Sequence, residues 1–106
     1  MKILENAHAQ SDSKVLLETN EVKIEQTKLS EDLSTTTITI APGREYQFKA
    51  RSGIVQTYVG TGSISNGAGE LDLDMFHKIS IERGEQLTIK NTHDQIPLVV
   101  NIISAN

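Results

Sequence analysis

The stretch that decides the fold is TTTITIAPGREYQFKAR, which occupies residues 35–51 of a chain of 106 residues. Residues 35–40 consist entirely of threonine and isoleucine, and β-branched residues with a period of two are typical of a strand with one buried face. Pro42-Gly43 predicts a turn after this strand. Residues 46–51 then alternate between apolar and polar side chains, which indicates a second strand.

Short alternating runs separated by turn residues continue in both directions from this stretch. Upstream, residues 14–18 and 22–29 predict two strands joined by a turn at Asn20, since asparagine tolerates left-handed backbone angles. Downstream, the expected turns are at Ser52-Gly53, Gly60-Thr61-Gly62, Asn66-Gly67 and Arg83-Gly84-Glu85. The chain therefore predicts an all-β protein with nine or ten short antiparallel strands and no helix, in a sandwich or barrel.

The composition excludes several classes of function. The formal net charge is −4 and aromatic residues make up only 4% of the chain, which argues against a nucleic-acid partner. The absence of cysteine excludes disulfides, thiolate zinc sites and cysteine nucleophiles. No apolar run approaches the roughly 20 residues that a membrane-spanning helix needs, so we expect no membrane partner and a cytoplasmic location.

The expected domain organisation is a loose N-terminal arm at residues 1–13 and a single domain at residues 14–106, with no signal peptide. A domain of this size buries only about 65% of the surface of its unfolded chain, so a partner subunit on one sheet face would stabilise it. We therefore expect a homodimer. The side chains expected to form the core and this interface are Phe48, Ile54, Tyr58, Leu71, Leu73, Ile79, Ile81, Leu87, Ile89, Val99 and Val100.

Several of these features together resemble the cupin superfamily. The Pro-Gly pair at residues 42–43 and the glycine turn at residues 60–62 are similar to the first cupin motif. Gly84 and Asn91 have the spacing that ends the second motif, and residues 15–22 and the strand after Pro97 are also similar. The resemblance extends over residues 39–103 and implies a double-stranded β-helix, or jelly-roll barrel.

The metal ligands of that family are not matched. Counting from Gly43 places Lys49 and Arg51 at the His-x-His pair, with Val55 or Gln56 at the glutamate and Leu87 at the second-motif histidine. Protonated Lys and Arg offer no lone pair to a metal, and Val and Leu have no donor atom. A slip of one residue would instead place Phe48 and Ala50 inside. Neither register restores a ligand set, so we expect no metal and no cofactor.

Few other residues suggest chemistry. His8 lies in the expected arm, and His77 is expected to be an exposed strand residue. His93-Asp94 combines a histidine with a carboxylate, as in general base catalysis, although we expect the pair to be part of a polar turn between two strands. An acidic row at residues 70–74 is expected to be a solvated strand face. We assign no catalytic residue. The residues expected to line a ligand site at the barrel mouth are Lys49, Arg51, Gln56, Tyr58 and His77.

The sequence thus favours a metal-free cupin-like module that binds a small molecule, such as an anion or a sugar, or has a structural role, and that acts as a homodimer. One alternative is a metal-independent sugar epimerase or isomerase, which would need a histidine beside a carboxylate inside a pocket. Another is a cupin with a displaced metal site built from His77, His93 or the acidic row. A further alternative is an unrelated β-sandwich used in adhesion or assembly.

Overall fold

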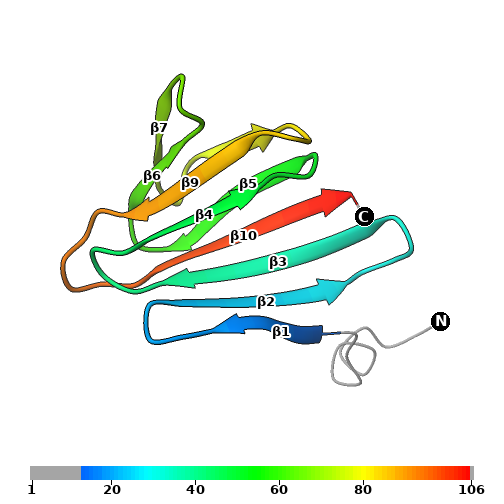
Figure 1. The fold of residues 1–106 in the computed structure, drawn as a ribbon, viewed down its shortest axis with the longest axis horizontal. Coiled ribbons are helices and arrows are strands. Elements are labelled where there is room, and N and C mark those ends of the chain that lie inside the picture. The colour runs from blue at the N-terminus through cyan, green and yellow to red at the C-terminus, as the bar shows by residue number, and fades with distance from the viewer. Residues whose placement is uncertain (1–12, 106) are drawn as a thin grey trace.

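The computed structural model describes residues 13–105, which contain ten β-strands and no helix (Figure 1). The strands are β1 (Ser13–Glu18), β2 (Val22–Lys28), β3 (Leu33–Ile40), β4 (Glu45–Lys49), β5 (Gly53–Val59), β6 (Gly62–Ser65), β7 (Glu70–Leu73), β8 (Lys78–Ile81), β9 (Gln86–Asn91) and β10 (Leu98–Ala105). The all-β prediction is confirmed, and the strands begin and end close to the expected turns.

The strands form two antiparallel sheets. The larger sheet has the order β1-β2-β3-β10-β5-β8, and the smaller one has the order β4-β9-β6-β7. The last strand, β10, therefore lies in the middle of the larger sheet, between β3 and β5, as the red arrow in Figure 1 shows. Strands that are neighbours in sequence, such as β3 and β4, pass from one sheet to the other, and this alternation produces the jelly-roll barrel.

The core lies between the inner faces of the two sheets. In β3 the alternation expected from sequence is confirmed, since Ile38 and Ile40 are buried. Three residues expected in the core or an interface, Ile54, Tyr58 and Leu71, are about half exposed. The buried apolar residues are Val22, Ile24, Ile38, Ile40, Ala50, Val55, Ile64, Leu73, Ile81, Leu87, Ile89, Leu98, Val100 and Ile102.

Strand β4 resolves the register that the sequence left open. Phe48 is half-buried and Ala50 is buried, whereas Lys49 and Arg51 are exposed. Phe48 is paired with Leu87 of β9, whose side chain is also buried, so the inner face of the smaller sheet holds both. The motif count that placed Lys49 and Arg51 inside the barrel is therefore replaced by the alternative register.

The glycine turn between β5 and β6 is required by close backbone contact. Gly60 has a φ of +86°, and a Cβ at this position would lie 2.5 Å from the carbonyl oxygen of Pro97. At Gly62 a Cβ would lie closer still to the carbonyl oxygen of Lys90. Only glycine combines the left-handed φ with the absence of a side chain at Gly60. The turn thus brings β5 and β6 against the β9–β10 loop.

Of the expected N-terminal arm at residues 1–13, residues 1–12, which include His8, lie outside the described residues, whereas Ser13 belongs to the first strand. Strand β1 begins at Ser13, whose hydroxyl is hydrogen-bonded to that of Thr27 on β2. Residues 13–105 contain no helix that is long and apolar enough to cross a membrane.

Candidate functional site

A cavity of about 350 Å³ opens between the larger sheet and the edge strand β4 of the smaller sheet. Its floor is formed by inward-facing residues of β2, β3 and β10, including Ile24, Ile38 and Ile102. Leu16 and Leu17 of the edge strand β1 border it on the outside. The cavity is therefore lined mainly by aliphatic side chains, which suits the apolar part of a small ligand.

One wall of the cavity is aromatic. Tyr46 and Phe48 lie two residues apart on the same face of β4, and both are half-buried. Their rings are stacked, with centroids 5.9 Å apart and planes inclined by 12°. Because β4 pairs only with β9 in its sheet, the other side of the strand opens onto the cavity. The stacked pair presents a flat apolar surface there.

Three polar residues also line the cavity, and the sequence did not single them out. They are Gln26 on β2, Thr36 on β3 and Ser104 on β10. Each lies on the inner face of its strand, two residues from a buried aliphatic residue. The sequence holds one signal for Gln26. This residue follows Val22 and Ile24 on the same face of β2, and a polar side chain on an otherwise apolar strand face indicates a polar group directed toward the interior.

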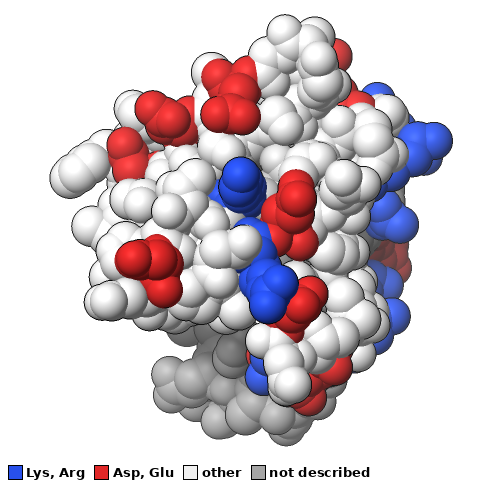
Figure 2. All heavy atoms as spheres, turned by 60° about the vertical axis from the view of Figure 1, so that its left-hand side comes forward, with Lys and Arg blue, Asp and Glu red and all other residues white. Residues whose placement is uncertain are grey.

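Lys49 and Arg51 border the mouth of the cavity, and both side chains are exposed. Neither lies within 4.0 Å of a carboxylate oxygen in the part of the chain that the structure describes, whereas Arg44 and Lys23 do form ion pairs. Figure 2, in which the left-hand side of Figure 1 is turned forward, shows basic groups next to acidic ones in the middle of the face. The two cations at the mouth are thus available to a negatively charged ligand.

The barrel interior does not fit a metal ion. At the positions where the cupin resemblance implies ligands, the inward-facing residues are Phe48, Ala50, Val55 and Leu87. Phenylalanine, alanine, valine and leucine have no side-chain donor atom. Within residues 13–105 no group of three or more His, Asp or Glu side chains is arranged to hold a metal, so the displaced-site alternative has no ligand set there.

The other residues expected at the site lie elsewhere. Gln56 and Tyr58 lie on the outer face of β5, because Val55 and Thr57 face the core. His77 lies in the β7–β8 turn, where its Nδ1 is 3.3 Å from Asp74 Oδ2 on an exposed part of the surface. These three residues do not line the cavity with Lys49 and Arg51. The expected set of five is therefore not brought together.

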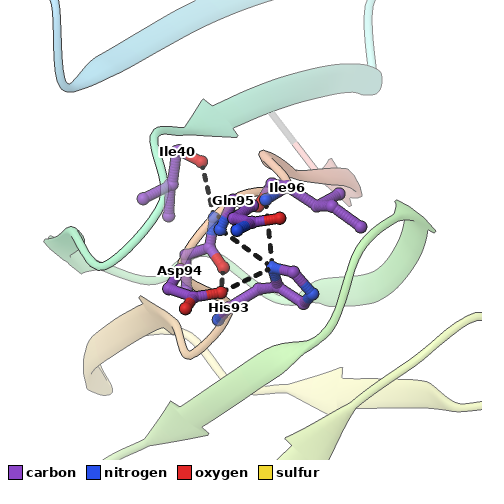
Figure 3. A network of polar contacts seen from close by, with 6 residues as sticks. Ile40, His93, Asp94, Gln95 and Ile96 are labelled. Atoms are coloured by element: carbon purple, nitrogen blue, oxygen red, sulfur yellow. Dashed lines mark hydrogen bonds and ion pairs between the residues drawn. The ribbon is translucent and has the colours of Figure 1, made fainter.

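In the β9–β10 loop, the His93 side chain is hydrogen-bonded to the backbone of the loop itself (Figure 3). His93 Nδ1 accepts hydrogen bonds from the backbone N–H groups of Gln95 and Ile96, each at 3.0 Å. A nitrogen that accepts these two hydrogen bonds does not at the same time donate one, so the 3.6 Å approach of Nδ1 to Asp94 is not a hydrogen bond. The pair is not arranged as a general base with its carboxylate partner.

Asn91, at the end of the second cupin-like motif, anchors this loop. It is fully buried, and its Nδ2 donates to the carbonyl oxygens of Ile40, at 3.0 Å, and Ile96, at 2.9 Å. Its Oδ1 accepts from the backbone N–H of His93 at 2.9 Å. One amide therefore joins the end of β3 to both sides of the loop, which explains why a polar residue is buried here.

A second cavity, of about 380 Å³, lies between the β6–β7 turn and β8. Glu85 borders it, and both of its oxygens are hydrogen-bonded: Oε1 accepts from the backbone N–H of Glu82 at 2.7 Å and Oε2 from Asn66 Nδ2 at 3.2 Å. The bond from the Glu82 amide, and secondly that from Asn66, lowers the pKa of Glu85 below its usual 4.5. This carboxylate fastens two turns together.

The sequence matches no protein-family model, and it has no significant match among curated proteins. Solved structures are similar in fold. A protein of unknown function from Rhizobium leguminosarum superimposes with a TM-score of 0.69, at 14% identity over 84% of this chain and 86% of its own. A cupin superfamily protein from Desulfitobacterium hafniense gives 0.69, at 12% identity over 84% and 81%.

A third solved structure is an RmlC-like cupin with a double-stranded β-helix fold from Methanocaldococcus jannaschii. It superimposes with a TM-score of 0.67, at 11% identity over 87% of this chain and 88% of its own. The chain described here therefore has the cupin fold, and the alternative of an unrelated β-sandwich is wrong. At this level of identity the likeness establishes the fold alone, so function has to be argued from the cavity.

Proposed function

We propose that this protein is a metal-free cupin-fold module that binds a small organic anion with an apolar body in the cavity beside β4, and that it acts as a cytoplasmic homodimer. The observation that carries the proposal is an aliphatic and aromatic cavity of about 350 Å³ with Lys49 and Arg51 at its mouth. Cavities of this size are typical of small-molecule sites.

The apolar lining is expected to contribute more to affinity than the two cations. Each methylene group taken from water stabilises the complex by about 0.8 kcal/mol, so four to six of them contribute about 3–5 kcal/mol. An exposed ion pair contributes only about 0.2–1 kcal/mol. Lys49 and Arg51 thus select the sign of the ligand's charge, while the cavity between Phe48 and Ile102 selects the size of its apolar part.

No histidine among the described residues lines this cavity. The epimerase or isomerase alternative therefore lacks a base there, and the proposal is a binding module rather than an enzyme. A sugar is a further ligand class to test, because Tyr46 and Phe48 offer a flat aromatic surface.

Titration calorimetry with straight-chain carboxylates of four to ten carbons, the matching alcohols and a set of monosaccharides tests the proposal. We expect affinity to rise about three- to fourfold per methylene until the cavity is full. The carboxylate should bind a few-fold more tightly than its alcohol. In the variant K49Q/R51Q this preference should vanish, and in the control Lys90→Gln, an exposed lysine that does not line the cavity, it should remain.

Two results would overturn the proposal. One is the absence of binding by every carboxylate at millimolar concentration. The other is binding that leaves the NMR signals of Phe48 and Ile102 unchanged, which would place the ligand elsewhere. Tight binding of a sugar with no dependence on Lys49 or Arg51 would replace the anion with a carbohydrate.

A further inference from the structure

We infer that a second copy of this chain docks on the outer face of the larger sheet, with the two-fold axis running along β10. The inference deepens the homodimer part of the proposed function by assigning its surface and symmetry. It does not depend on the ligand cavity, which opens on the other face of this sheet.

The outer face of the three middle strands, β3, β10 and β5, has no charged residue. Ile103 and Ile54 are paired across β10 and β5, near the start of β5 and the end of β10, and they are 42% and 48% exposed. Depletion of charge around exposed aliphatic residues is typical of the centre of a protein interface. The outward-facing residues of these strands are Leu33, Thr35, Thr37, Thr39, Ile54, Gln56, Tyr58, Val99, Asn101, Ile103 and Ala105.

The outer face of the smaller sheet is different. Its cross-strand neighbours include the opposite charges Glu45 and Lys90, and Asp72 and Glu70 lie on β7 at the sheet edge. A face of this kind is well solvated. Of the two outer faces, only that of the larger sheet has the composition of an interface.

Charges return at the two sides of the larger sheet, with Lys23 and Glu25 on β2 and Lys78 on β8. The register places five residues in one row across the sheet, from β2 to β8: Glu25, Thr37, Asn101, Gln56 and Lys78. The acidic end of the row is on β2 and the basic end is on β8. Asn101 occupies the middle of the row.

This row selects one two-fold arrangement. An axis parallel to β10 and lying between two facing sheets places β2 of one copy opposite β8 of the other, so that Glu25 faces Lys78 of the second copy at both ends. An axis perpendicular to the strands would place Glu25 opposite Glu25 and Lys78 opposite Lys78. Like charges in contact are destabilising, so the axis along β10 is favoured.

The dimensions permit this packing. Five strands about 4.8 Å apart and three cross-strand rows give a face of about 20 Å by 20 Å, or about 400 Å² in projection. The accessible surface of the side chains that protrude from such a face is larger than its projection and approaches the lower limit of stable interfaces, at about 600 Å² per partner. The strands of two aligned, facing sheets cross at about 30°. At about 10 Å from the axis, this crossing shifts facing residues of the two copies by about 5 Å relative to each other. The length of a lysine side chain spans that displacement.

Three residues of the row, Glu25, Thr37 and Asn101, have partners within the chain. Lys23 Nζ lies 3.0 Å from Glu25 Oε1, so the second copy's Lys78 would join an existing pair. Asn101 Nδ2 donates to Thr37 Oγ1 at 3.2 Å. Asn101 itself is only 7% exposed, so it fills the middle of the row without protruding toward the second copy. Because exposed ion pairs are weak, charge reversals should change affinity only a few-fold.

Sedimentation equilibrium on the full chain, whose monomer mass is 11.7 kDa, tests the inference. The native chain should be a dimer, and Ile103→Asp should weaken dimerisation at least 100-fold while circular dichroism shows that it remains folded. The matched control is Thr88→Asp on the outer face of β9, which should leave the dimer unchanged. A native monomer at 100 μM, or dissociation by Thr88→Asp instead, would overturn the inference.

Charge reversal tests the symmetry. Glu25→Lys and Lys78→Glu should each weaken the dimer about three- to tenfold, and the double variant should restore it. With the perpendicular axis, neither single reversal changes the pattern of like charges, so no weakening there would contradict the axis along β10. Calorimetry on the Ile103→Asp monomer separates the two proposals, because the cavity should still bind its ligand when the dimer is lost.

Discussion

The cavity mouth beside β4 and the β9–β10 loop both place polar side chains against an apolar interior, yet they differ in one respect. In the loop, Asn91 and His93 form hydrogen bonds with the backbone of the same chain (Figure 3). At the mouth, Lys49 and Arg51 have no carboxylate partner among the described residues. The comparison teaches that a polar cluster alone is a poor guide to function. Polar residues that are already hydrogen-bonded within the chain stabilise the fold, whereas those without such partners are available to a ligand.

The largest expected effect of a loop substitution is that of Asn91→Ala. It leaves the carbonyl oxygen of Ile40 and the N–H of His93 without their partner, which should lower the free energy of unfolding by about 3 kcal/mol. For a domain of this size the melting temperature should fall by about 12–20 °C. Urea and thermal unfolding followed by circular dichroism measure both quantities.

The mouth supplies the comparison for that experiment. K49Q/R51Q should change the free energy of unfolding by no more than about 0.5 kcal/mol, because within residues 13–105 neither side chain has a carboxylate partner to lose. Its ligand affinity should nevertheless fall, while Asn91→Ala should retain affinity below its melting temperature. If the mouth variant were the less stable of the two, the distinction between the regions would be lost.

A smaller effect is expected at His93, and the type of substitution decides it. His93→Ala removes the acceptor for the N–H groups of Gln95 and Ile96 and should destabilise the protein by about 1 kcal/mol. In His93→Asn the side-chain oxygen can accept from the same N–H groups, two and three residues on, and should recover most of the loss. Asparagine can replace the imidazole as a hydrogen-bond acceptor but not as a catalytic base, so recovery of stability by His93→Asn indicates that the acceptor is what the loop requires.

Hydrogen–deuterium exchange checks this interpretation at the loop itself. The amide protons of Gln95 and Ile96 should exchange faster in His93→Ala than in the native chain, and His93→Asn should restore their protection. Equal protection in all three proteins would show that the imidazole does not hold the loop.

The comparison also shows which features the sequence could predict. The strands and turns follow from alternation and from glycines such as Gly60, so the fold class and the cupin resemblance were accessible. The face of β5 was not, because apolar residues lie on both sides of it: Ile54 and Tyr58 outside, Val55 inside. The sequence therefore places Gln56 and Tyr58 at the cavity mouth, whereas in the structure both side chains lie on the outer face of the larger sheet.

The cavity itself was only partly predictable. Lys49 and Arg51 were expected at its mouth, although the motif count left open which of two registers applied. Pairing between β4 and β9 decides that register, and no local pattern encodes a pairing between strands some 40 residues apart. Leu16, Gln26 and Ser104 come from β1, β2 and β10, which are not neighbours of β4 in sequence, so their convergence could not be foreseen from spacing.

The smallest expected effect concerns Glu85, which is partly exposed, yet bonded within the chain. Its lowered pKa means that folding favours the ionised form, so its stabilisation is present above the unfolded pKa of about 4.5 and is lost as pH falls through the folded pKa. Glu85→Gln should therefore lower stability at pH 7, and the difference from the native chain should shrink steadily between about pH 5 and pH 3. Urea unfolding at half-unit pH steps measures this difference.

The matched control is Glu70→Gln, which borders the same cavity. It should leave the free energy of unfolding at pH 7 unchanged, since no hydrogen bond from a described residue to its carboxylate is present. If Glu85→Gln and Glu70→Gln changed the stability at pH 7 equally, the bonds from Glu82 and Asn66 would contribute nothing to folding. The expected contrast would show that the difference between the loop and the mouth also holds for surface carboxylates. Glu85, which is hydrogen-bonded within the chain, would stabilise the fold, and Glu70 would not.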